Sequence, residues 1–336
     1  MKNERPVRLG ILGCSDIARR RTLPAVLKVP EVTVAAVASR CEDTARAVAA
    51  RFGGEAVAGY EALLESPDVE AVYVSLPTGL HHHWIERALR AGKHVLAEKP
   101  LTARHPDTVA AVGLAHSLGL TLMENMTFPQ HSMHEAVRGM LEKGDIGELR
   151  SISAEFGFPP LHPGNVRYRA DLAGGSLLDA GVYPLTAASM FLGPELDVVG
   201  ATLRKGTAAD VDVAGDALLS APDGRTAHVS FGFEHVYRCA YTLWGSEGRI
   251  VVDRAFTPPP DFRPTVRLER ADEVRERLLP ADDQFAGTLA RFVRAIAGGG
   301  AAAHGAEVVA RARLVRQVQD RARLLGNGWS GGADGR

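Results

Sequence analysis

In its first third, the chain alternates continuous apolar runs with segments of helical periodicity. The apolar runs predict buried strands at 7–12, 32–38, 71–76, 94–97 and 120–123. The segments between them predict helices at 17–28, 42–52, 80–91 and 106–118. Apolar strands that alternate with helices are typical of a parallel sheet covered on both faces. We therefore predict an α/β fold whose N-terminal part, residues 1–124, is a Rossmann-type doubly wound domain with its ligand site at the carboxyl ends of the strands.

After about Glu124 the pattern changes to longer segments of alternating apolar and polar residues, separated by turn signals such as Pro222-Asp223-Gly224. This alternation predicts a mainly antiparallel sheet with strands at 149–156, 196–203, 214–221, 226–233, 237–244 and 249–252. Helices are predicted at 132–143, 182–191, 285–297 and 306–325. We therefore expect a second α/β domain over 125–325, followed by a disordered tail at 326–336.

Composition and charge fit a two-domain enzyme and exclude several other classes of protein. Two domains are the natural expectation for 336 residues. Lys and Arg number 39 and Asp and Glu 40, so the net charge gives no drive toward nucleic acid or an anionic membrane. The sequence contains neither a signal peptide nor an apolar run of about 18 residues. Three scattered cysteines predict no disulfide framework and no metal site, which favours a cytoplasmic setting.

The turn after the first strand resembles the dinucleotide fingerprint G-x-G-x-x-G/A, with serine at the second glycine. Glycine at the first position permits a tight turn, and alanine at the last permits close packing of helix and strand. The amides at the helix N-terminus would then face a pyrophosphate. An ordinary strand–turn–helix is equally consistent with this segment alone. The candidate cofactor-binding residues here are Gly13, Cys14, Ser15, Asp16, Ile17 and Ala18.

The end of the second strand indicates which dinucleotide binds. An NAD-binding domain places a carboxylate there to bind the ribose 2′-hydroxyl, but this chain has Ser39 and Arg40 instead. A hydroxyl and a planar guanidinium suit a 2′-phosphate. We therefore predict NADP(H) as the cofactor, the alternative being a surface Ser-Arg pair with no ligand.

Two later motifs carry groups for acid–base chemistry. Lys99 follows Glu98 at a strand end, where ligands bind, although an exposed strand-end lysine is the simpler interpretation. Asp179 and Tyr183 are four residues apart, so a helix would place them on one face. A phenol can protonate a developing alkoxide, and a carboxylate can orient a neighbouring group. The alternative is a helix start with a capping aspartate and a packed tyrosine.

Taken together and in this order, the motifs resemble those of the Gfo/Idh/MocA oxidoreductase family. The resemblance covers about residues 6–325 and includes a Leu-Pro-x-x-x-His segment from Leu76 to His81. It implies a Rossmann domain and a C-terminal α/β domain with an open mixed sheet that often forms a dimer or tetramer interface. It further implies that Lys99 lies beside the nicotinamide and that Tyr183, where related dehydrogenases have histidine, assists proton transfer. Further candidates for cofactor binding by the same resemblance are Leu76, His81, Glu98 and Arg167.

Shorter stretches such as Leu-Met-Glu-Asn-Met-Thr-Phe are similar to those of NDP-hexose 3-ketoreductases of deoxysugar and antibiotic pathways. This resemblance implies NADPH-dependent reduction of the C3 keto group of a dTDP-linked 3,4-diketo-2,6-dideoxyhexose. Lys99 and Tyr183, whose side chains both titrate near pH 10 when free, would stabilise and protonate the oxyanion. Arg20, Tyr237 and Trp244 are weaker candidates for substrate contacts, since core packing explains the two aromatic residues equally well and a solvated helix face explains Arg20 better.

Two other functions remain open at this point. One is an NADP-dependent dehydrogenase of the same family that acts on a free sugar, cyclitol or dihydrodiol. The other is a non-enzymatic regulator that senses NADP, against which the presence of both Lys99 and Tyr183 argues. A short-chain reductase is excluded because no Tyr-x-x-x-Lys occurs in the chain. The expected partners are a nucleotide sugar and further copies of the chain, as a homodimer or homotetramer formed through the C-terminal sheet.

Overall fold

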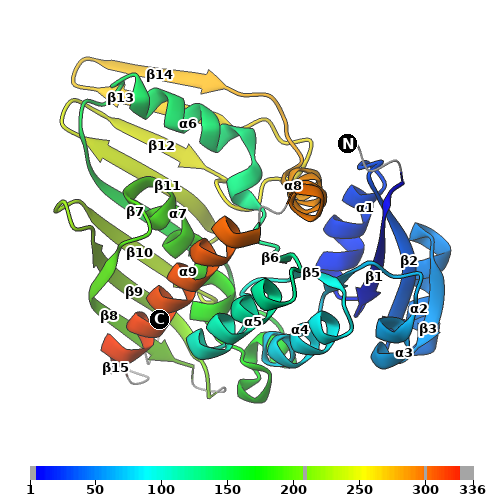
Figure 1. The fold of residues 1–336 in the computed structure, drawn as a ribbon. Helices are drawn as coiled ribbons and strands as arrows, with labels where there is room; N and C mark the ends of the chain where they lie inside the picture. Colours follow the sequence, from blue (N-terminus) through cyan, green and yellow to red (C-terminus); the bar gives the residue numbers. More distant parts are fainter. Residues whose placement is uncertain (1–4, 207–209, 299–300, 326–336) are drawn as a thin grey trace, which may run out of the picture. The chain divides into compact units, whose positions relative to one another are not determined.

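The computed structural model describes residues 5–206, 210–298 and 301–325, which fold into two compact units (Figure 1). The first unit comprises Met1–Ala136, Pro258–Arg263 and Pro280–Ala312. The second comprises Val137–Thr257, Pro264–Leu279 and Arg313–Arg336. This division differs from the predicted boundary after residue 124, because a helical segment near the C-terminus packs with the first unit. The predicted tail at 326–336 lies outside the described residues.

The first unit contains a six-stranded parallel sheet in the order β3-β2-β1-β4-β5-β6, which confirms the predicted Rossmann arrangement. Its strands are β1 (Val7–Leu12), β2 (Val32–Ser39), β3 (Glu55–Ala58), β4 (Ala71–Val74), β5 (His94–Ala97) and β6 (Leu122–Glu124). Strand β3 was not predicted, because its residues are exposed or half-buried and form no continuous apolar run. The strand order reverses between β1 and β4, and in such sheets ligands bind at this reversal.

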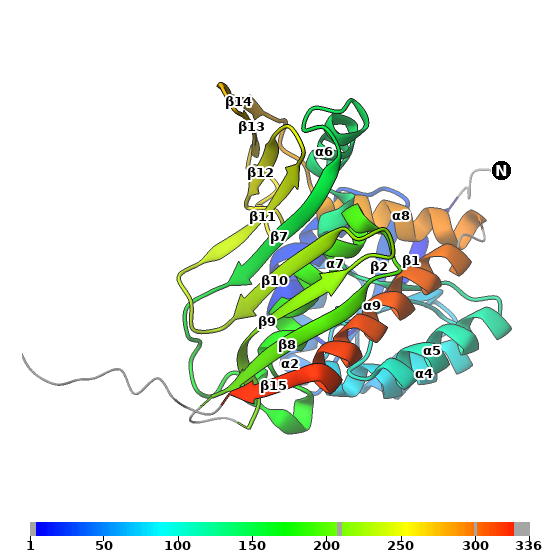
Figure 2. The same ribbon diagram turned by 90° about the vertical axis from the view of Figure 1, so that its left-hand side faces the viewer.

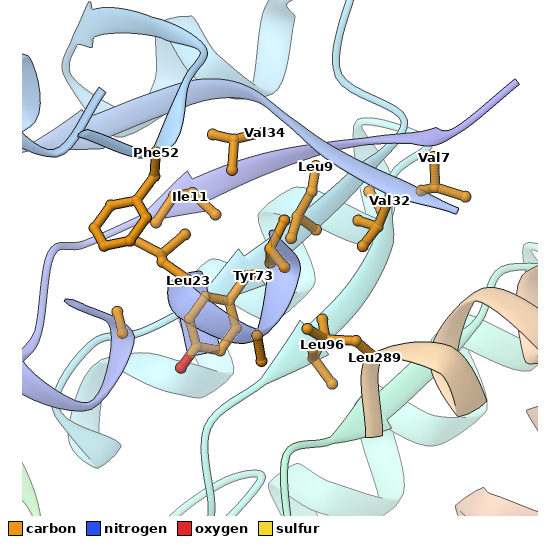
Figure 3. Packing of buried hydrophobic residues seen from close by; sticks show 14 of the residues in the cluster. Val7, Leu9, Ile11, Leu23, Val32, Val34, Phe52, Tyr73, Leu96 and Leu289 are labelled. Atoms are coloured by element: carbon orange, nitrogen blue, oxygen red, sulfur yellow. The ribbon is translucent and has the colours of Figure 1, made fainter. Parts of the chain in front are cut away.

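Apolar side chains cover both faces of this sheet. Because side chains alternate along a strand, Leu9 and Ile11 enter one cluster and Leu12 enters the other. The first cluster, part of which is shown in Figure 3, includes side chains of α1 (Leu23–Val26), α2 (Glu42–Phe52) and α8 (Gln284–Gly298). The second includes side chains of α3 (Tyr60–Glu65), α4 (His81–Arg90), α5 (His105–Ser117) and α9 (Ala301–Arg321). Burial on both faces explains why the strands are apolar throughout.

Two predicted helices differ from the structure. The predicted helix at 17–28 is a π-helical turn, η1 (Ala18–Thr22), followed by the short helix α1. The predicted helix at 306–325 begins earlier and ends at Arg321, and β15 (Ala322–Leu325) follows it. β15 pairs in parallel with β8 (Asp197–Lys205). Without β15, β8 would be the edge strand of the sheet. The backbone hydrogen bonds between β8 and β15 replace those that a further helical turn would have formed.

The second unit is built on a nine-stranded sheet in the order β14-β13-β12-β11-β7-β10-β9-β8-β15 (Figure 2). Only the pairs β7–β10 and β8–β15 are parallel, so the sheet is mixed and mainly antiparallel, as predicted. Its other strands are β7 (Leu149–Gly157), β9 (Asp212–Ser220), β10 (Thr226–Gly232), β11 (Arg238–Gly245), β12 (Arg249–Asp253), β13 (Thr265–Arg270) and β14 (Glu273–Leu278). The last two were not predicted, because only Val266 of β13 is buried and β14 is exposed at every position.

Helical turns of the second unit pack on β7, β9 and β10. They are η6 (Leu177–Gly181), a π-helical turn, and α7 (Val182–Leu192), which continues it. The remaining elements of the described chain are η2 (Thr78–Leu80), η3 (Phe128–Gln130), α6 (Ser132–Glu142), η4 (Val166–Tyr168) and η5 (Ala170–Leu172). Among the described residues, none of the helices has the length and apolar character that a membrane span requires.

Candidate active site

The turn after β1 requires glycine at its first position for two reasons. Gly13 has a φ of 88°, a conformation that other residues rarely adopt. A Cβ at this position would lie 2.6 Å from the carbonyl oxygen of Ser75 and 2.6 Å from Cδ2 of Leu76, both at the end of β4. The Gly13 amide donates to the carbonyl of Ala38 near the end of β2, 3.0 Å away. The ends of β1, β2 and β4 therefore meet at this glycine.

Ser15, which departs from the fingerprint, forms contacts that glycine could not. Its Oγ accepts a hydrogen bond from the Ala18 amide at 3.2 Å and is hydrogen-bonded to Oγ of Ser75. The serine thus caps the turn η1 and joins it to β4. Ala18 is fully buried, as close packing of helix and strand requires. Asp16, Ile17 and Arg20 are exposed, and Asp16 forms an ion pair of 2.5 Å with Arg19.

The end of β2 lies close to this turn. Oγ of Ser39 accepts a hydrogen bond from the Cys41 amide at 3.2 Å, and Arg40 is exposed beside it. Burial raises the pKa of the Cys14 thiol, while the charge of Arg19 and a hydrogen bond with Ser39 partly oppose this increase. Cys14 therefore lies within reach of Ser39, which brings together the two segments predicted to hold the dinucleotide.

Sequence patterns did not reveal Tyr60, which lies beside Arg40. Burial raises the pKa of Tyr60, and the Arg40 charge and backbone amide act in the opposite direction. Its ring packs edge-on against Trp84, with ring centroids 4.9 Å apart. Tyr60 follows β3, a strand that the pattern did not predict, so nothing in the sequence placed it at this edge of the sheet.

The side chain of His81 contacts the backbone that follows two of the strands. Its side chain is buried, with Nε2 2.8 Å from the carbonyl oxygen of Leu76 and Nδ1 2.9 Å from that of Pro100. It therefore joins the segments that follow β4 and β5. Both ring nitrogens lie within hydrogen-bonding distance of a backbone carbonyl oxygen, so the side chain contacts the backbone of both segments. Contact of His81 with the cofactor stays a prediction.

Lys99 is half-buried and follows Glu98, a residue that is 8% exposed. Oε1 of Glu98 accepts hydrogen bonds from the Tyr73 hydroxyl at 2.5 Å and from Nδ2 of Asn125 at 2.7 Å. Oε2 accepts from the Lys99 amide at 3.3 Å. The Lys99-Pro100 peptide bond is cis. The predicted cofactor residue Glu98 is therefore an internal acceptor that holds the backbone of Lys99.

The buried carboxylate of Glu124 binds the backbone two residues after Lys99. Oε1 of Glu124 accepts from the Leu101 amide at 2.8 Å, and Oε2 forms an ion pair with Arg311 of α9. The amide of Glu124 donates to Nε2 of His304 at 3.0 Å. Burial and two nearby arginines lower the pKa of His304 to about 3, so the imidazole is neutral and accepts this bond. Nothing in the sequence indicated that Glu124 pairs with Arg311, which lies 187 residues further along the chain.

In the second unit, the Gly-Gly motif permits two close backbone approaches. A Cβ on Gly174 would lie 2.4 Å from the Arg167 carbonyl oxygen, and one on Gly175 would lie 2.4 Å from Oδ1 of Asp212. Oδ2 of Asp212 accepts from Oγ of Ser176 at 2.7 Å and from the Leu177 amide at 2.6 Å. Burial raises the pKa of Asp212, and these hydrogen bonds oppose the increase. Asp212, the first residue of β9, therefore caps the start of η6.

Asp179 and Tyr183 share one face, as the spacing predicted. Of residues 175–188, only these two are not buried. Oδ2 of Asp179 lies 2.6 Å from Nε of Arg167, so the carboxylate orients the guanidinium. The Tyr183 ring packs against Phe156 and Phe256, with centroids 4.9 and 5.9 Å away. The structure thus brings three predicted site residues together on η6, α7 and the segment before them.

The two weaker substrate candidates on the sheet differ in position. The Tyr237 hydroxyl is 3.0 Å from Oγ1 of Thr257, next to the Phe256 that contacts Tyr183. Trp244 is 66% exposed and alternates along β11 with Tyr241, which packs against α7 through Phe191. Trp244 therefore points to the opposite face of the sheet from Tyr183 and does not join this cluster. In the described part of the chain, no group of three His, Cys, Asp or Glu residues is arranged to hold a metal ion.

Two family models match the chain. One, described as an oxidoreductase family with an NAD-binding Rossmann fold, matches residues 7–126. The other, the GFO/IDH/MocA C-terminal domain, matches residues 134–251.

Several similar proteins are named for one reaction. The chain is 50% identical to a dTDP-3,4-didehydro-2,6-dideoxy-alpha-D-glucose 3-reductase of Streptomyces violaceoruber, over 96% of this chain and 97% of that protein. It is 51% identical to the reductase of that name from Actinomadura kijaniata, over 88% and 90%. A crystal structure of a 3-ketoreductase from Actinomadura kijaniata with NADP and TDP-benzene has a TM-score of 0.94 at 48% identity, over 96% and 99%. Further structures of that reductase carry a substitution at one lysine or one tyrosine.

We expect Gly13→Ala to weaken NADPH binding by roughly 10-fold or more. The new Cβ would push the turn away from β4 and displace the backbone amides that would face the pyrophosphate. Fluorescence titration with NADPH measures the dissociation constant. Gly53→Ala is the matched control, since Gly53 has a φ of 92° but no atom within 4 Å of an added Cβ. Equal weakening in both variants would show that backbone strain alone, and not the contact with β4, matters.

Proposed function

The chain belongs to the GFO/IDH/MocA oxidoreductase family, and on this premise we propose that it reduces the C3 keto group of a dTDP-linked 3,4-diketo-2,6-dideoxyhexose with NADPH. The observation that carries this proposal is identity of about one half, over nearly the whole chain, to reductases named for this reaction. A similar 3-ketoreductase has been solved with NADP and a TDP compound bound. The reduced product belongs to deoxysugar and antibiotic biosynthesis, and we place the reaction in the cytoplasm, where the free cysteines of the chain remain reduced.

Lys99 and Tyr183 are the proposed catalytic residues. The lysine and the tyrosine substituted in structures of the Actinomadura reductase are separated by the same number of residues as Lys99 and Tyr183. Both side chains keep partial exposure within segments that are otherwise largely buried. The two residues thus have the chemistry, the spacing and the access that the reaction needs.

The first unit fits a bound NADP(H). Gly13 allows the backbone to turn where the ends of β1, β2 and β4 meet, and Ser15 caps the helical turn whose amides would face the pyrophosphate. Ser39 and Arg40 would hold the 2′-phosphate, with Tyr60 beside them. The proposed cofactor-binding residues are Gly13, Cys14, Ser15, Asp16, Ile17, Ala18, Ser39, Arg40, Leu76 and Tyr60.

When bound, NADPH supplies the hydride that is transferred to the C3 carbonyl carbon. Lys99, as an ammonium, stabilises the negative charge that develops on the C3 oxygen. Tyr183, as a phenol, donates a proton to that oxygen. Asp179 holds the guanidinium of Arg167, whose charge would contact the cofactor or the substrate, so Asp179 acts as a positioning residue. We also propose that Tyr237, whose hydroxyl lies 3.0 Å from Oγ1 of Thr257, contacts the sugar.

We expect Lys99→Ala and Tyr183→Phe each to lower kcat by roughly 100-fold or more, the usual contribution of a positioned acid or charge. The assay uses NADPH with an enzymatically generated dTDP-3,4-diketo sugar, and calorimetry with dTDP measures substrate binding separately. Tyr241→Phe, which removes a fully buried hydroxyl of the same unit as Tyr183, is the control. Near-normal turnover in both Lys99→Ala and Tyr183→Phe would refute the assignment.

We expect Arg40→Ala to raise the dissociation constant for NADPH by roughly 10- to 100-fold and to leave that for NADH unchanged, because only NADPH loses a charged hydrogen bond. The control is Arg46→Ala on α2, since Arg46 is also exposed but pairs with Glu42 and Asp43. If the preference for NADPH over NADH survives in Arg40→Ala, Arg40 does not select the cofactor.

We propose that the sheet of the second unit forms the interface of a homodimer or homotetramer. Helical turns contact one face of the sheet through β7, β9 and β10. The other face carries Trp244, which is 66% exposed, and half-buried Ser153 and Thr242 beside it. This face is hollowed, and the lining includes Ser151, Ser153, Glu155, Thr242, Trp244 and Arg249. A large exposed aromatic ring among partly buried polar groups suits the centre of a protein interface.

Sedimentation velocity tests this interface. We expect the native chain to sediment as a dimer or tetramer and Trp244→Glu to shift it toward monomer, since a carboxylate would be buried without a partner. Leu27→Glu is the matched control, because Leu27 is equally exposed at 66% but lies in the first unit. A monomeric native chain, or a Trp244→Glu variant that associates normally, would contradict the proposal.

A further inference from the structure

Tyr73 is a buried phenol at the centre of the first unit. It lies on β4 with no exposed surface, and its ring packs among the apolar side chains of the cluster in Figure 3, where its oxygen is at the tip. Burying a hydroxyl away from water is costly unless it is hydrogen-bonded. The Tyr73 hydroxyl lies 2.5 Å from Oε1 of Glu98 and 2.9 Å from Oγ1 of Thr22, and it is also hydrogen-bonded to the Ser75 side chain.

The chemistry of these partners sets the direction of the hydrogen bonds. A carboxylate only accepts, so the single proton of the Tyr73 hydroxyl is donated to Glu98. The Thr22 hydroxyl must then donate to the Tyr73 oxygen. Burial and the neighbouring Glu98 charge raise the pKa of Tyr73 well above its usual value, so the phenol keeps the proton that it donates.

The ends of this chain of hydrogen bonds lie at the two parts of the proposed site in this unit. Thr22 is the last residue of η1, the turn that Ser15 caps and whose amides would face the pyrophosphate. Glu98 accepts from the amide of Lys99. The directed chain therefore runs from Thr22 through Tyr73 to Glu98, and the Lys99 amide joins it at the carboxylate.

The three bonds to the Glu98 carboxylate are unequal. The Tyr73 hydroxyl and the Asn125 amide lie 2.5 and 2.7 Å from Oε1, whereas the Lys99 amide lies 3.3 Å from Oε2. The two shorter bonds therefore fix the carboxylate, and the longer bond depends on where they hold it. Without the Tyr73 hydroxyl, one neutral donor remains on Oε1 and the carboxylate can rotate away from the Lys99 amide.

We propose that Tyr73 is a positioning residue for Lys99, and that the chain Thr22–Tyr73–Glu98 couples the cofactor turn to the lysine. The inference rests on the proposed catalytic role of Lys99. A dinucleotide bound at η1 restricts the motion of Thr22. Through its hydrogen bonds, the Tyr73 hydroxyl extends this restriction to the Glu98 carboxylate, which holds the backbone of Lys99. The lysine is thus set most firmly in the complex that is ready to react.

Tyr73→Phe tests the proposal because it keeps the buried ring and removes only the hydroxyl. We expect kcat to fall by about 10-fold, since misplaced reacting groups lose one to two orders of magnitude. The dissociation constants for NADPH and dTDP should change by less than about 2-fold, because the proposed ligand-binding residues are untouched. Hydrogen exchange of the Lys99 amide should accelerate. Tyr241→Phe, which removes the other fully buried phenol hydroxyl among the described residues, should change neither kcat nor this exchange.

A second pair of variants tests the coupling and serves even if Tyr73→Phe is poorly folded. Thr22→Val keeps the side-chain shape but removes the donor to Tyr73, and we expect NADPH then to protect the Lys99 amide less than it does in the native enzyme. Thr22→Ser retains a hydroxyl and should restore that protection. Protection by NADPH that is the same in Thr22→Val and the native enzyme would overturn the coupling.

The outcomes separate this inference from the proposed function. If Lys99→Ala loses turnover while Tyr73→Phe retains native kcat and native exchange at Lys99, the positioning role is wrong and the proposed function stands. If Lys99→Ala itself keeps native turnover, the proposed function of the lysine fails before Tyr73 is considered. Equal loss of kcat in Tyr73→Phe and Tyr241→Phe would show a general cost of removing buried hydroxyls and would also overturn the positioning role.

Discussion

The buried carboxylate of Glu98 is the constraint on which the geometry of the first unit depends. A charged group that is 8% exposed must be met by donors, because its desolvation otherwise costs several kcal/mol. The donors come from β4, from the residue after β6 and from the backbone of Lys99. Meeting this requirement joins three neighbouring strands at their carboxyl ends and leaves the lysine backbone little freedom.

The same physical device recurs elsewhere in the described chain. Glu124 accepts from the amide of Leu101 and pairs with Arg311, so the segment after Lys99 is held from α9. In the second unit, Asp212 accepts from the start of η6, the turn that carries Asp179 and leads to Tyr183. Each proposed catalytic group thus lies on or beside backbone that a buried or half-buried acid from another segment holds. Groups positioned in this way lose little order when substrate binds, which favours the reaction geometry.

Sequence patterns predicted those elements whose signals are local. The apolar strands of the first sheet were evident because both of their faces are buried, and Gly13 and Ala18 were evident because the turn itself needs small residues. Strand β14 was missed because it is exposed at every position and carries no apolar alternation, and β13 was missed because only its Val266 is buried. The sequence left the face of Trp244 open, because a strand residue's face follows from its register in the sheet, which the sequence does not state.

The sequence by itself therefore determined the α/β class and the cofactor turn and indicated the proposed reactive groups, since each depends on residues adjacent in the chain. Only the tertiary structure decided what holds them. Tyr73 and Thr22 are unremarkable in sequence, and Arg311 lies in a run of arginines typical of a solvated helix. Folding places Tyr73 and Arg311 against the buried carboxylates of Glu98 and Glu124, and it places Thr22 against the Tyr73 hydroxyl. Away from water, a hydrogen bond from a distant residue is the remaining way to satisfy such a charge.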